Sequence, residues 1–426
     1  MAGCNSAKAR RRRVVGTGAA VGAFAAAAAM ATGSAPSARA DILDNILDPI
    51  IQPLVTSLTD AVGAIDPAAA TDLTSLFDMS ALSLSSVDPA AAVSQATQFD
   101  NALNALFGAD LFGASATQPA AAAASAAAAT PTNVDVPMGV AVGTEPYVDV
   151  SVNGGPAEPV LVDTGSSGLV IPIQDIGWWN LATLGFPTGG GISGYSGGVD
   201  YFYLTFNTPV SFDNLSGSVL DTTTGSTSVE VPIFSWPTSL GGPLSIQQFF
   251  QDDGVQGILG IGENAAGPSV SPITALPGDL SQGVTVNVPG QDLILGPNPF
   301  TTGYNDVSTS GAPISNLLVS IDGGAAQPVS QANIDSGGVY GAIPSSLLTS
   351  SEWNSSTDTV DPGTVISVYN SSHQLLYSYT VTATNSPTVV SGGTMDTGYV
   401  PFSQAPIFTS YSPSPNGTTT FDLPAT

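Results

Sequence analysis

The chain has 426 residues, enough for one large domain or two ordinary ones, and its charge is distributed unevenly. All six lysine and arginine residues precede Asp41, so the rest of the chain carries 33 acidic side chains and neither lysine nor arginine. Such a surface repels phosphate backbones and anionic lipid headgroups, which argues against nucleic acid and membrane surfaces as partners. The acidity serves either solubility or adaptation to acid, where protonated carboxyl groups relieve the repulsion.

The N-terminus has the features of an export signal. A basic cluster at Arg10–Arg13 precedes an apolar run from Val14 to Ala31, and Ala38-Arg39-Ala40 supplies a small-x-small cleavage site. We therefore predict a signal peptide over residues 1–40, used by the Sec or the Tat pathway. The protein would then be secreted or held in the cell envelope, without stable membrane insertion after the signal is cleaved.

Cysteine and histidine are almost absent, and this restricts the chemistry available. Cys4 is the only cysteine and would be lost with the signal peptide, and His373 is the only histidine. The exported chain would have no disulfide, no Cys–His nucleophile and no Cys/His zinc site, and without lysine it has no P-loop. Carboxylates and hydroxyls remain in quantity, and we expect no metal or organic cofactor.

Two segments separate the signal from the rest of the chain. Apolar residues recur at spacings of three and four from Ile42 to Val62, so residues 41–113 are predicted to be helical, with interruptions at Pro49 and Pro53. Their apolar face would pack on itself or on the next domain, or bind a partner or an envelope component. Residues 114–133 are rich in alanine and predict a linker open to proteolysis.

Residues 134–426 have the texture of a mainly β domain. Alternating β-branched and aromatic runs occur at residues 147–152 and 201–206, and turns rich in Gly, Pro, Asn and Asp separate the runs. No pattern typical of a long helix is present in this region.

An internal repeat organises this region. The first copy contains VSVNGG at residues 150–155, PVLVDTG at 159–165 and VIP at 170–172. The second contains VSIDGG at 319–324, PV at 328–329, IDSG at 334–337 and AIP at 342–344. Both copies predict a strand, an Asn/Asp-Gly-Gly turn and a second strand that ends in Asp-Thr/Ser-Gly. The second copy carries three extra residues between the turn and the aspartate.

The repeat places one aspartate in each of two similar halves. Asp335 follows Asp163 by 172 residues, which predicts two lobes that face each other, with their boundary near residues 300–315. Two carboxyl groups about 3 Å apart cannot both ionise, so they share one proton. The ionised member can activate a water molecule, while the protonated member polarises a peptide carbonyl. The hydroxyls of Thr164 and Ser336 are expected to brace one turn against the other.

These turns resemble the paired active-site turns of pepsin-like aspartic proteases. The resemblance rests on DTGSSG at residues 163–168, DSGG at 335–338 and GILG at 257–260. It implies a bilobal β fold, catalysis by Asp163 and Asp335, and a supporting role for the turn residues Thr164, Gly165, Ser166, Ser336 and Gly337. In this family a tyrosine on a flap closes over the substrate, and Tyr195 matches it, with Tyr201 and Tyr203 as rivals.

The segment from about residue 133 to 426 is similar to the catalytic domain of mycobacterial PE-family aspartic proteases. This similarity implies an endopeptidase that cleaves exported or cell-surface proteins, including PE-domain proteins and itself. We expect the protein to be a monomer. The sequence departs from the family pattern in three respects. The predicted signal peptide and helical segment stand in place of a PE module, Gly338 stands where many pepsin-like enzymes have Ser or Thr, and no second apolar-apolar-Gly strand is recognisable.

Three other interpretations remain open. Asp396 begins a third Asp-Thr-Gly, but it lacks the preceding apolar strand and the downstream Ile-Pro pair, so we predict a loop there. Ser196 lies in a Gly-x-Ser-x-Gly motif upstream of His373, which is the chain order of a serine hydrolase, although the residues after Ser196 alternate as a strand. Finally, the chain can be a binding protein that keeps the protease fold without turnover.

Overall fold

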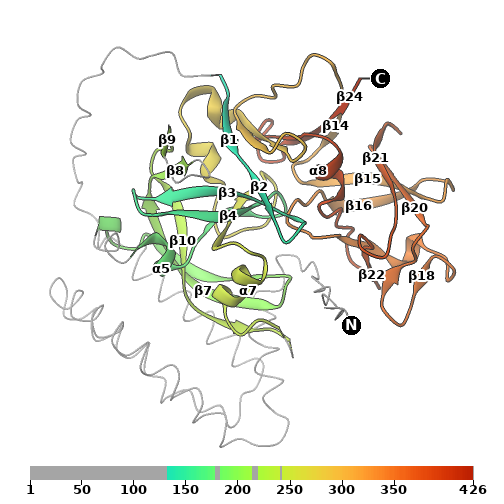
Figure 1. Cartoon of the computed structure of the whole chain (residues 1–426), viewed down its shortest axis with the longest axis horizontal. Helices are drawn as coiled ribbons and strands as arrows, with labels where there is room; N and C mark the ends of the chain where they lie inside the picture. Colours follow the sequence, from blue (N-terminus) through green and yellow to red (C-terminus); the bar gives the residue numbers. More distant parts are fainter. Residues whose placement is uncertain (1–131, 178–182, 214–218, 240–241, 426) are drawn as a thin grey trace, which may run out of the picture. The chain divides into compact units, whose positions relative to one another are not determined.

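The computed structural model describes residues 132–177, 183–213, 219–239 and 242–425, and these residues fall within one compact unit (Figure 1). The predicted signal peptide over residues 1–40, the predicted helical segment 41–113 and nearly all of the predicted linker lie outside the described residues. The described part is mainly β, as the sequence predicted. Within it, no helix is long and apolar enough to cross a membrane.

A ten-stranded sheet contains the first copy of the repeat. Nine strands follow the order β6-β7-β10-β5-β11-β4-β3-β8-β9, and β2 pairs with β3 beside this path. The strands are β2 (Gly139–Ala141), β3 (Glu145–Val152), β4 (Ala157–Asp163), β5 (Ser167–Val170), β6 (Gly189–Tyr195), β7 (Val199–Thr208), β8 (Val210–Asp213), β9 (Val219–Thr223), β10 (Thr227–Pro237) and β11 (Gly257–Ile261). Of the short helices α5 (Ile173–Ile176) and α7 (Ile246–Asp252), α7 packs against β7 and β10.

Two four-stranded sheets contain the second copy. Their orders are β16-β15-β20-β21 and β17-β22-β19-β18, drawn in orange in Figure 1. The strands are β15 (Ile314–Ile321), β16 (Gln327–Asn333), β17 (Ala342–Pro344), β18 (Trp353–Asn354), β19 (Thr359–Val360), β20 (Val365–Tyr369), β21 (Leu375–Thr380) and β22 (Thr388–Val390). The 3₁₀ turn η4 (Ser345–Leu347) and helix α8 (Val400–Gln404) lie in the same part of the chain.

A six-stranded sheet combines segments that are far apart in the sequence. Its order is β1-β13-β12-β23-β24-β14. The strands are β1 (Val134–Pro137), β12 (Gly283–Asn287), β13 (Asp292–Leu295), β14 (Tyr304–Ser310), β23 (Ile407–Ser410) and β24 (Thr418–Pro424), and the 3₁₀ turns η2 (Pro272–Ala275) and η3 (Gly278–Gln282) precede β12. The sheet therefore joins the first strand of the described domain to its last ones.

The two copies of the repeat fold alike. β3 and β4 form an antiparallel pair, and so do β15 and β16. The turns between them have positive φ at equivalent positions, 54° at Asn153 and 73° at Gly154 against 49° at Asp322 and 72° at Gly323. Asn, Asp and Gly tolerate this conformation, which explains the Asn/Asp-Gly pattern. A register shift between β15 and β16 accommodates extra length in the second copy.

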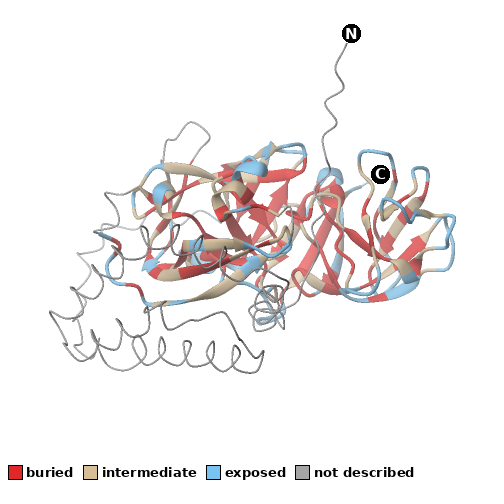
Figure 2. Ribbon diagram, turned by 90° about the horizontal axis from the view of Figure 1, so that it is seen from below, coloured by how far each residue is buried: buried red, intermediate tan, exposed pale blue. Residues whose placement is uncertain are grey.

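The core is built from the inward-facing residues of these strands (Figure 2). It also contains carboxyl groups, since the side chains of Asp213, Glu230 and Asp422 are 0% exposed. The described residues include no lysine or arginine, so neutral donors hold these groups. Ser269 Oγ donates to Glu230 at 3.0 Å, and Asn298 Nδ2 donates to Asp422 at 2.9 Å. Burial raises the pKa of Glu230 and of Asp422 to about 7.

Reciprocal hydrogen bonds join the two Asp turns. Thr164 Oγ1 accepts from the backbone N–H of Ser336 at 2.9 Å and donates to the carbonyl of Ile334 at 2.6 Å. Ser336 Oγ accepts from the N–H of Thr164 at 3.0 Å and donates to the carbonyl of Val162 at 2.6 Å. Both hydroxyl side chains are buried. Four hydrogen bonds thus connect chain segments about 170 residues apart, in the bracing arrangement expected from the sequence.

Replacing the Thr164 hydroxyl by a methyl group should destabilise the domain. Thr164→Val keeps the shape of the side chain but leaves the N–H of Ser336 and the carbonyl of Ile334 without their partner. Each buried group left in this way costs about 1–3 kcal/mol. We expect a lower Tm in thermal unfolding, whereas Thr164→Ser, which keeps the hydroxyl, should lose much less. Equal losses in both variants would contradict a structural role for these hydrogen bonds.

Candidate active site

Asp163 and Asp335 occupy matching turns at the ends of buried strands. Asp163 is the last residue of β4, and Asp335 lies two residues after β16. Oδ1 of each carboxyl accepts from the N–H two residues ahead, from Gly165 at 2.8 Å and from Gly337 at 2.9 Å. This local hydrogen bond fixes the orientation of each carboxyl within its turn.

The Oδ2 atoms have different partners in the two turns. Ser166 Oγ donates to Oδ2 of Asp163 at 2.5 Å. Asn333 Nδ2 donates to Oδ2 of Asp335 at 3.2 Å. Asn333 was not among the site residues predicted from the sequence, and only its place two residues before Asp335 pointed to it. Two similar turns therefore hold their carboxyl groups by different donors.

The two carboxyl groups meet. A side-chain hydrogen bond joins Asp335 to Asp163. The glycines in the turns make this approach possible, because a Cβ added at Gly165 would meet the carboxyl of Asp335 and one added at Gly337 would lie 3.0 Å from Oδ1 of Asp163. The structure thus brings the predicted residues of both turns together.

The pair holds a proton over an extended pH range. The pKa of Asp335 is raised to about 7, mainly by burial and further by the negative charge of Asp396, although its hydrogen bond from Asp163 lowers it. Asp163 is 8% exposed and accepts hydrogen bonds from Gly165 and Ser166. Below about pH 7 the pair therefore carries one proton, the state required to activate a water molecule and polarise a carbonyl.

Strand β11 supports the first turn. It pairs in parallel with β4, with Gly260 opposite Asp163, and antiparallel with β5, with Gly260 opposite Gly168. A Cβ at Gly260 would lie 2.6 Å from backbone atoms of Ser167, so glycine permits this close packing. The GILG sequence is thus the strand that lies against the first Asp turn.

Asp396 lies outside the named strands, in keeping with the predicted loop, but its segment contacts both sides of the second Asp turn. Asp396 bridges in parallel to Asn333 and antiparallel to Ala342, so its segment lies between the strand before the second turn and the strand after it. This is the counterpart of β11 that the sequence did not reveal. The backbone N–H of Asp335 donates to Thr397 Oγ1 at 3.1 Å, and a side-chain hydrogen bond joins Asp396 to Asp335. Of the apolar-apolar-Gly pattern, this segment keeps only the glycine, which is Gly398.

Tyr195 ends β6 of a hairpin whose other strand is β7. Its half-buried ring stacks on Phe249 at 5.3 Å between centroids and on Tyr201 at 5.6 Å. Burial raises the pKa of Tyr195 well above its ordinary value, and the neighbouring Tyr201 and Asp163 add to the shift. Its rivals Tyr201 and Tyr203 are buried within the strand, at 0% and 9% exposed, and form part of the apolar cluster around Phe249.

The geometry around Ser196 does not match a serine hydrolase. Ser196 is exposed in the hairpin turn between β6 and β7, where the nucleophile motif requires a strand followed by a helix. His373 is exposed in the turn between β20 and β21. Its N–H donates to the carbonyl of Asn370 at 3.0 Å, as in an ordinary tight turn.

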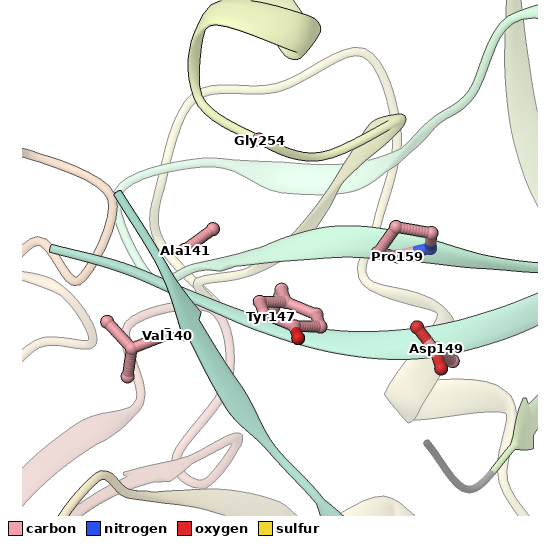
Figure 3. A pocket seen from close by; sticks show the side chains of 6 residues that line it. All are labelled: Val140, Ala141, Tyr147, Asp149, Pro159 and Gly254. Atoms are coloured by element: carbon pink, nitrogen blue, oxygen red, sulfur yellow. The ribbon is translucent and has the colours of Figure 1, made fainter. Parts of the chain in front are cut away.

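Other features of the described residues supply no comparable chemistry. A hollow of about 330 Å³ is lined by Val140, Ala141, Tyr147, Asp149, Pro159 and Gly254 (Figure 3). None of these residues belongs to the two Asp turns. Among the described residues, no group of three or more His, Cys, Asp and Glu side chains is arranged to hold a metal ion.

Comparison with known proteins finds relatives that are similar to this chain over about two thirds of its length. Two strains of Mycobacterium tuberculosis, CDC 1551 / Oshkosh and ATCC 25618 / H37Rv, have a protein named PE cleavage protein A that is 44% identical over 306 residues. The PE cleavage protein A of Mycobacterium marinum (strain ATCC BAA-535 / M) is 43% identical over the same length. Each match covers 68% of this chain and 52% of the relative, so the chain spans about half the length of the curated relatives it matches.

The family match covers the region that contains the braced turns. Residues 134–419 match the family described as the PE-PGRS C-terminal aspartyl peptidase-like domain. This range includes both copies of the repeat and the three carboxyl groups at residues 163, 335 and 396. The chain therefore belongs to the family of the PE-PGRS C-terminal aspartyl peptidase-like domain.

Proposed function

We propose that the chain is an aspartic endopeptidase that hydrolyses peptide bonds with a water molecule held between Asp163 and Asp335. The observation that carries the proposal is the hydrogen-bonded pair of carboxyl groups on two reciprocally braced turns. Membership of an aspartyl peptidase-like family supports it. The fold in this proposal is bilobal and pepsin-like, with one copy of the repeat in each lobe.

The two carboxyl groups act as a coupled pair. Asp163 accepts hydrogen bonds from a backbone N–H and from the Ser166 hydroxyl, and it shares a hydrogen bond with Asp335. The ionised member of the pair acts as the base toward water, and the protonated member donates toward the peptide carbonyl. The attacking water loses its proton to the pair as the tetrahedral intermediate forms, and the developing oxyanion is stabilised by hydrogen bonding.

Tyr195 is proposed as the residue that covers the substrate. It lies near the tip of a hairpin, stacks on Phe249, and is close enough to Asp163 for the carboxylate to affect its pKa. An aromatic side chain in this position can exclude water from the scissile bond and contact the substrate backbone.

The substrates proposed are exported or cell-surface proteins that carry PE domains, together with the chain's own N-terminal segments. The name of the relatives, PE cleavage protein A, supports this choice. Secretion through a signal peptide over residues 1–40 and a monomeric state complete the proposal. Cleavage within the alanine-rich residues 114–133 would separate the domain from the preceding segment.

Replacing either carboxyl group by an amide should abolish cleavage. For Asp163→Asn and Asp335→Asn we expect kcat/KM to fall roughly 10⁴-fold, because the pair acts as a unit. The assay uses fluorescein-labelled casein and a purified PE-domain protein, each with and without pepstatin. His373→Asn is the matched control for a serine hydrolase and should retain full activity. Absence of cleavage by the unmodified protein would favour the binding-protein interpretation.

A methyl group at Gly165 should also stop the reaction without removing any polar group. The Cβ of Gly165→Ala would overlap the carboxyl of Asp335 and force the two aspartates apart. A displacement of about 1 Å costs about 10²-fold in rate, so kcat/KM should fall by at least that factor. Gly225→Ala is the control, because its Cβ would meet nothing nearer than the Ala275 carbonyl at 3.6 Å. Full activity in Gly165→Ala would contradict catalysis by the pair.

The activity should decline as the pH rises through neutrality. The pKa of Asp335 is raised to about 7, so the proton needed on the pair is present below that pH and is lost above it. A profile of kcat/KM against pH should therefore show its basic limb near pH 7. A profile that is flat from pH 5 to 9 would be incompatible with a shared proton.

A further inference from the structure

The second Asp turn lacks the side chain that supports the first. Three residues after Asp163, Ser166 donates its hydroxyl to Asp163 Oδ2 at 2.5 Å. Three residues after Asp335 stands Gly338, which has no side chain to offer. A Cβ added at Gly338 would meet Oδ1 of Asp396. The carboxyl of Asp396 therefore occupies the space that a Ser166-like side chain would fill in the second turn.

The strand registers show what Asp396 replaces. In the first copy Ile258 pairs with Leu161 and with Val170, which lie two residues before and seven residues after Asp163. In the second copy Asp396 bridges to Asn333 and to Ala342, which lie two residues before and seven residues after Asp335. Asp396 is thus at the position of Ile258, where the first copy buries an apolar side chain that is 1% exposed.

Asp396 is held firmly in this position. Its side chain is 6% exposed, and its Oδ1 accepts from the N–H of Gly398 at 2.9 Å. Its backbone exchanges two hydrogen bonds of 2.9 Å with Ala342. The backbone of Asp396 is thus fixed by its pairing with Ala342, and turning the carboxyl toward solvent would break its hydrogen bond from Gly398. Its contact with Asp335 is therefore a fixed part of the site.

The surroundings of Asp396 contain no positive charge to offset it. The titratable groups that face it are Asp335, itself bonded to Asp163, and Tyr377 on β21, which lies beside Tyr379. Burial raises the pKa of Tyr377 well above its ordinary value, so this side chain stays neutral. Among the described residues there is no lysine or arginine, and His373 is exposed on a turn. Asp335 is therefore the carboxyl group whose pKa responds to the Asp396 charge.

We infer that Asp396 is a positioning residue of the catalytic pair, which supports Asp335 in place of the missing hydroxyl and extends proton sharing by the pair toward neutral pH. The inference rests on the proposed peptidase function. A hydroxyl in this place, as at Ser166, would stabilise the charged form of Asp335, whereas a neighbouring carboxyl disfavours it. The negative charge of Asp396 accordingly adds to burial in raising the pKa of Asp335.

The first experiment compares the pH profiles of kcat/KM for the unmodified protein and Asp396→Asn, with labelled casein as the probe. Asparagine keeps the shape and hydrogen-bonding capacity but removes the charge. The basic limb should move to lower pH by about one unit, because the pKa of Asp335 falls when the neighbouring charge is lost. Asp279→Asn, which removes an exposed carboxyl, should leave the limb where it was. An unshifted limb in Asp396→Asn would overturn the inference.

The second experiment restores the hydroxyl. Asp396→Ala empties the space beside Asp335 and should lower kcat. Adding Gly338→Ser to Asp396→Ala places a hydroxyl three residues after Asp335, as in the first turn, with its Cβ about 3.1 Å from the Cα of Gly398. This double variant should recover at least tenfold in kcat while its basic limb stays at low pH. Gly338→Ser alone should be impaired, because its Cβ would collide with the Asp396 carboxyl. If circular dichroism shows that the double variant is folded but its kcat does not recover, the carboxyl of Asp396 does not stand in for a hydroxyl at residue 338.

A thermal measurement tests the inference without relying on activity. The folded-state pKa of Asp335, about 7, lies above the roughly 3.9 of an unfolded aspartate. Its contribution to stability is therefore complete below about pH 4 and is lost as the pH rises to about 7. Between these pH values Tm should fall less in Asp396→Asn than in the unmodified protein. If no substrate is cut but this difference in Tm appears, the peptidase proposal fails and the coupling between Asp396 and Asp335 stands. Equal slopes of Tm against pH in the two proteins would refute the coupling alone.

Discussion

The geometry of the site depends on two buried hydroxyls that each serve the opposite half of the domain. Thr164 and Ser336 accept the N–H of each other's residue and donate to carbonyls at Ile334 and Val162. Since all these groups are buried, they have no access to solvent as an alternative partner, and any separation of the turns would leave them unpaired. Glycines beside the aspartates then let the carboxyl groups approach each other. The exchange of hydrogen bonds thus fixes the distance between the two carboxyl groups, which a single turn could not define.

The absence of basic residues gives this domain an unusual electrostatic character. Its buried carboxyl groups are held by hydroxyls, amides and backbone N–H groups, none of which compensates a full charge. Under these conditions burial favours the protonated form, and the pKa values of Glu230 and Asp335 are raised to about 7. Burial, which destabilises ionised carboxyl groups in the core at high pH, also keeps a proton on the pair formed by Asp163 and Asp335. The acidic surface and the protonated carboxyl groups of the interior are therefore two separate results of the same amino-acid composition of the domain, which lacks lysine and arginine.

The sequence predicted what is local or repeated. The β texture, the two Asn/Asp-Gly turns and the positions of Asp163 and Asp335 follow from patterns that occur twice and need no knowledge of distant contacts. Asp396 could not be assigned this way, because a segment equivalent to β11 is recognised by its apolar residues and the chain has a carboxyl where the first copy has Ile258. Asn333 was overlooked for a similar reason, since an amide two residues before an aspartate is uninformative until the strand is folded. The order of the six-stranded sheet depends on long-range pairing, for which the sequence held no signal.

That six-stranded sheet has a consequence for when the domain can begin to work. β1 pairs with β13, while β24 joins β14 and β23, so the sheet needs both the first and the last strands of the domain. The backbone near Asn416 and Gly417 also accepts from Gly311 and Ala312, next to the Pro313 carbonyl that receives the N–H of Ile334. A nascent chain that has not yet reached β24 lacks these supports beneath the second aspartate. The sheet beside the second turn is therefore complete only when the first and the last strands of the domain have both paired.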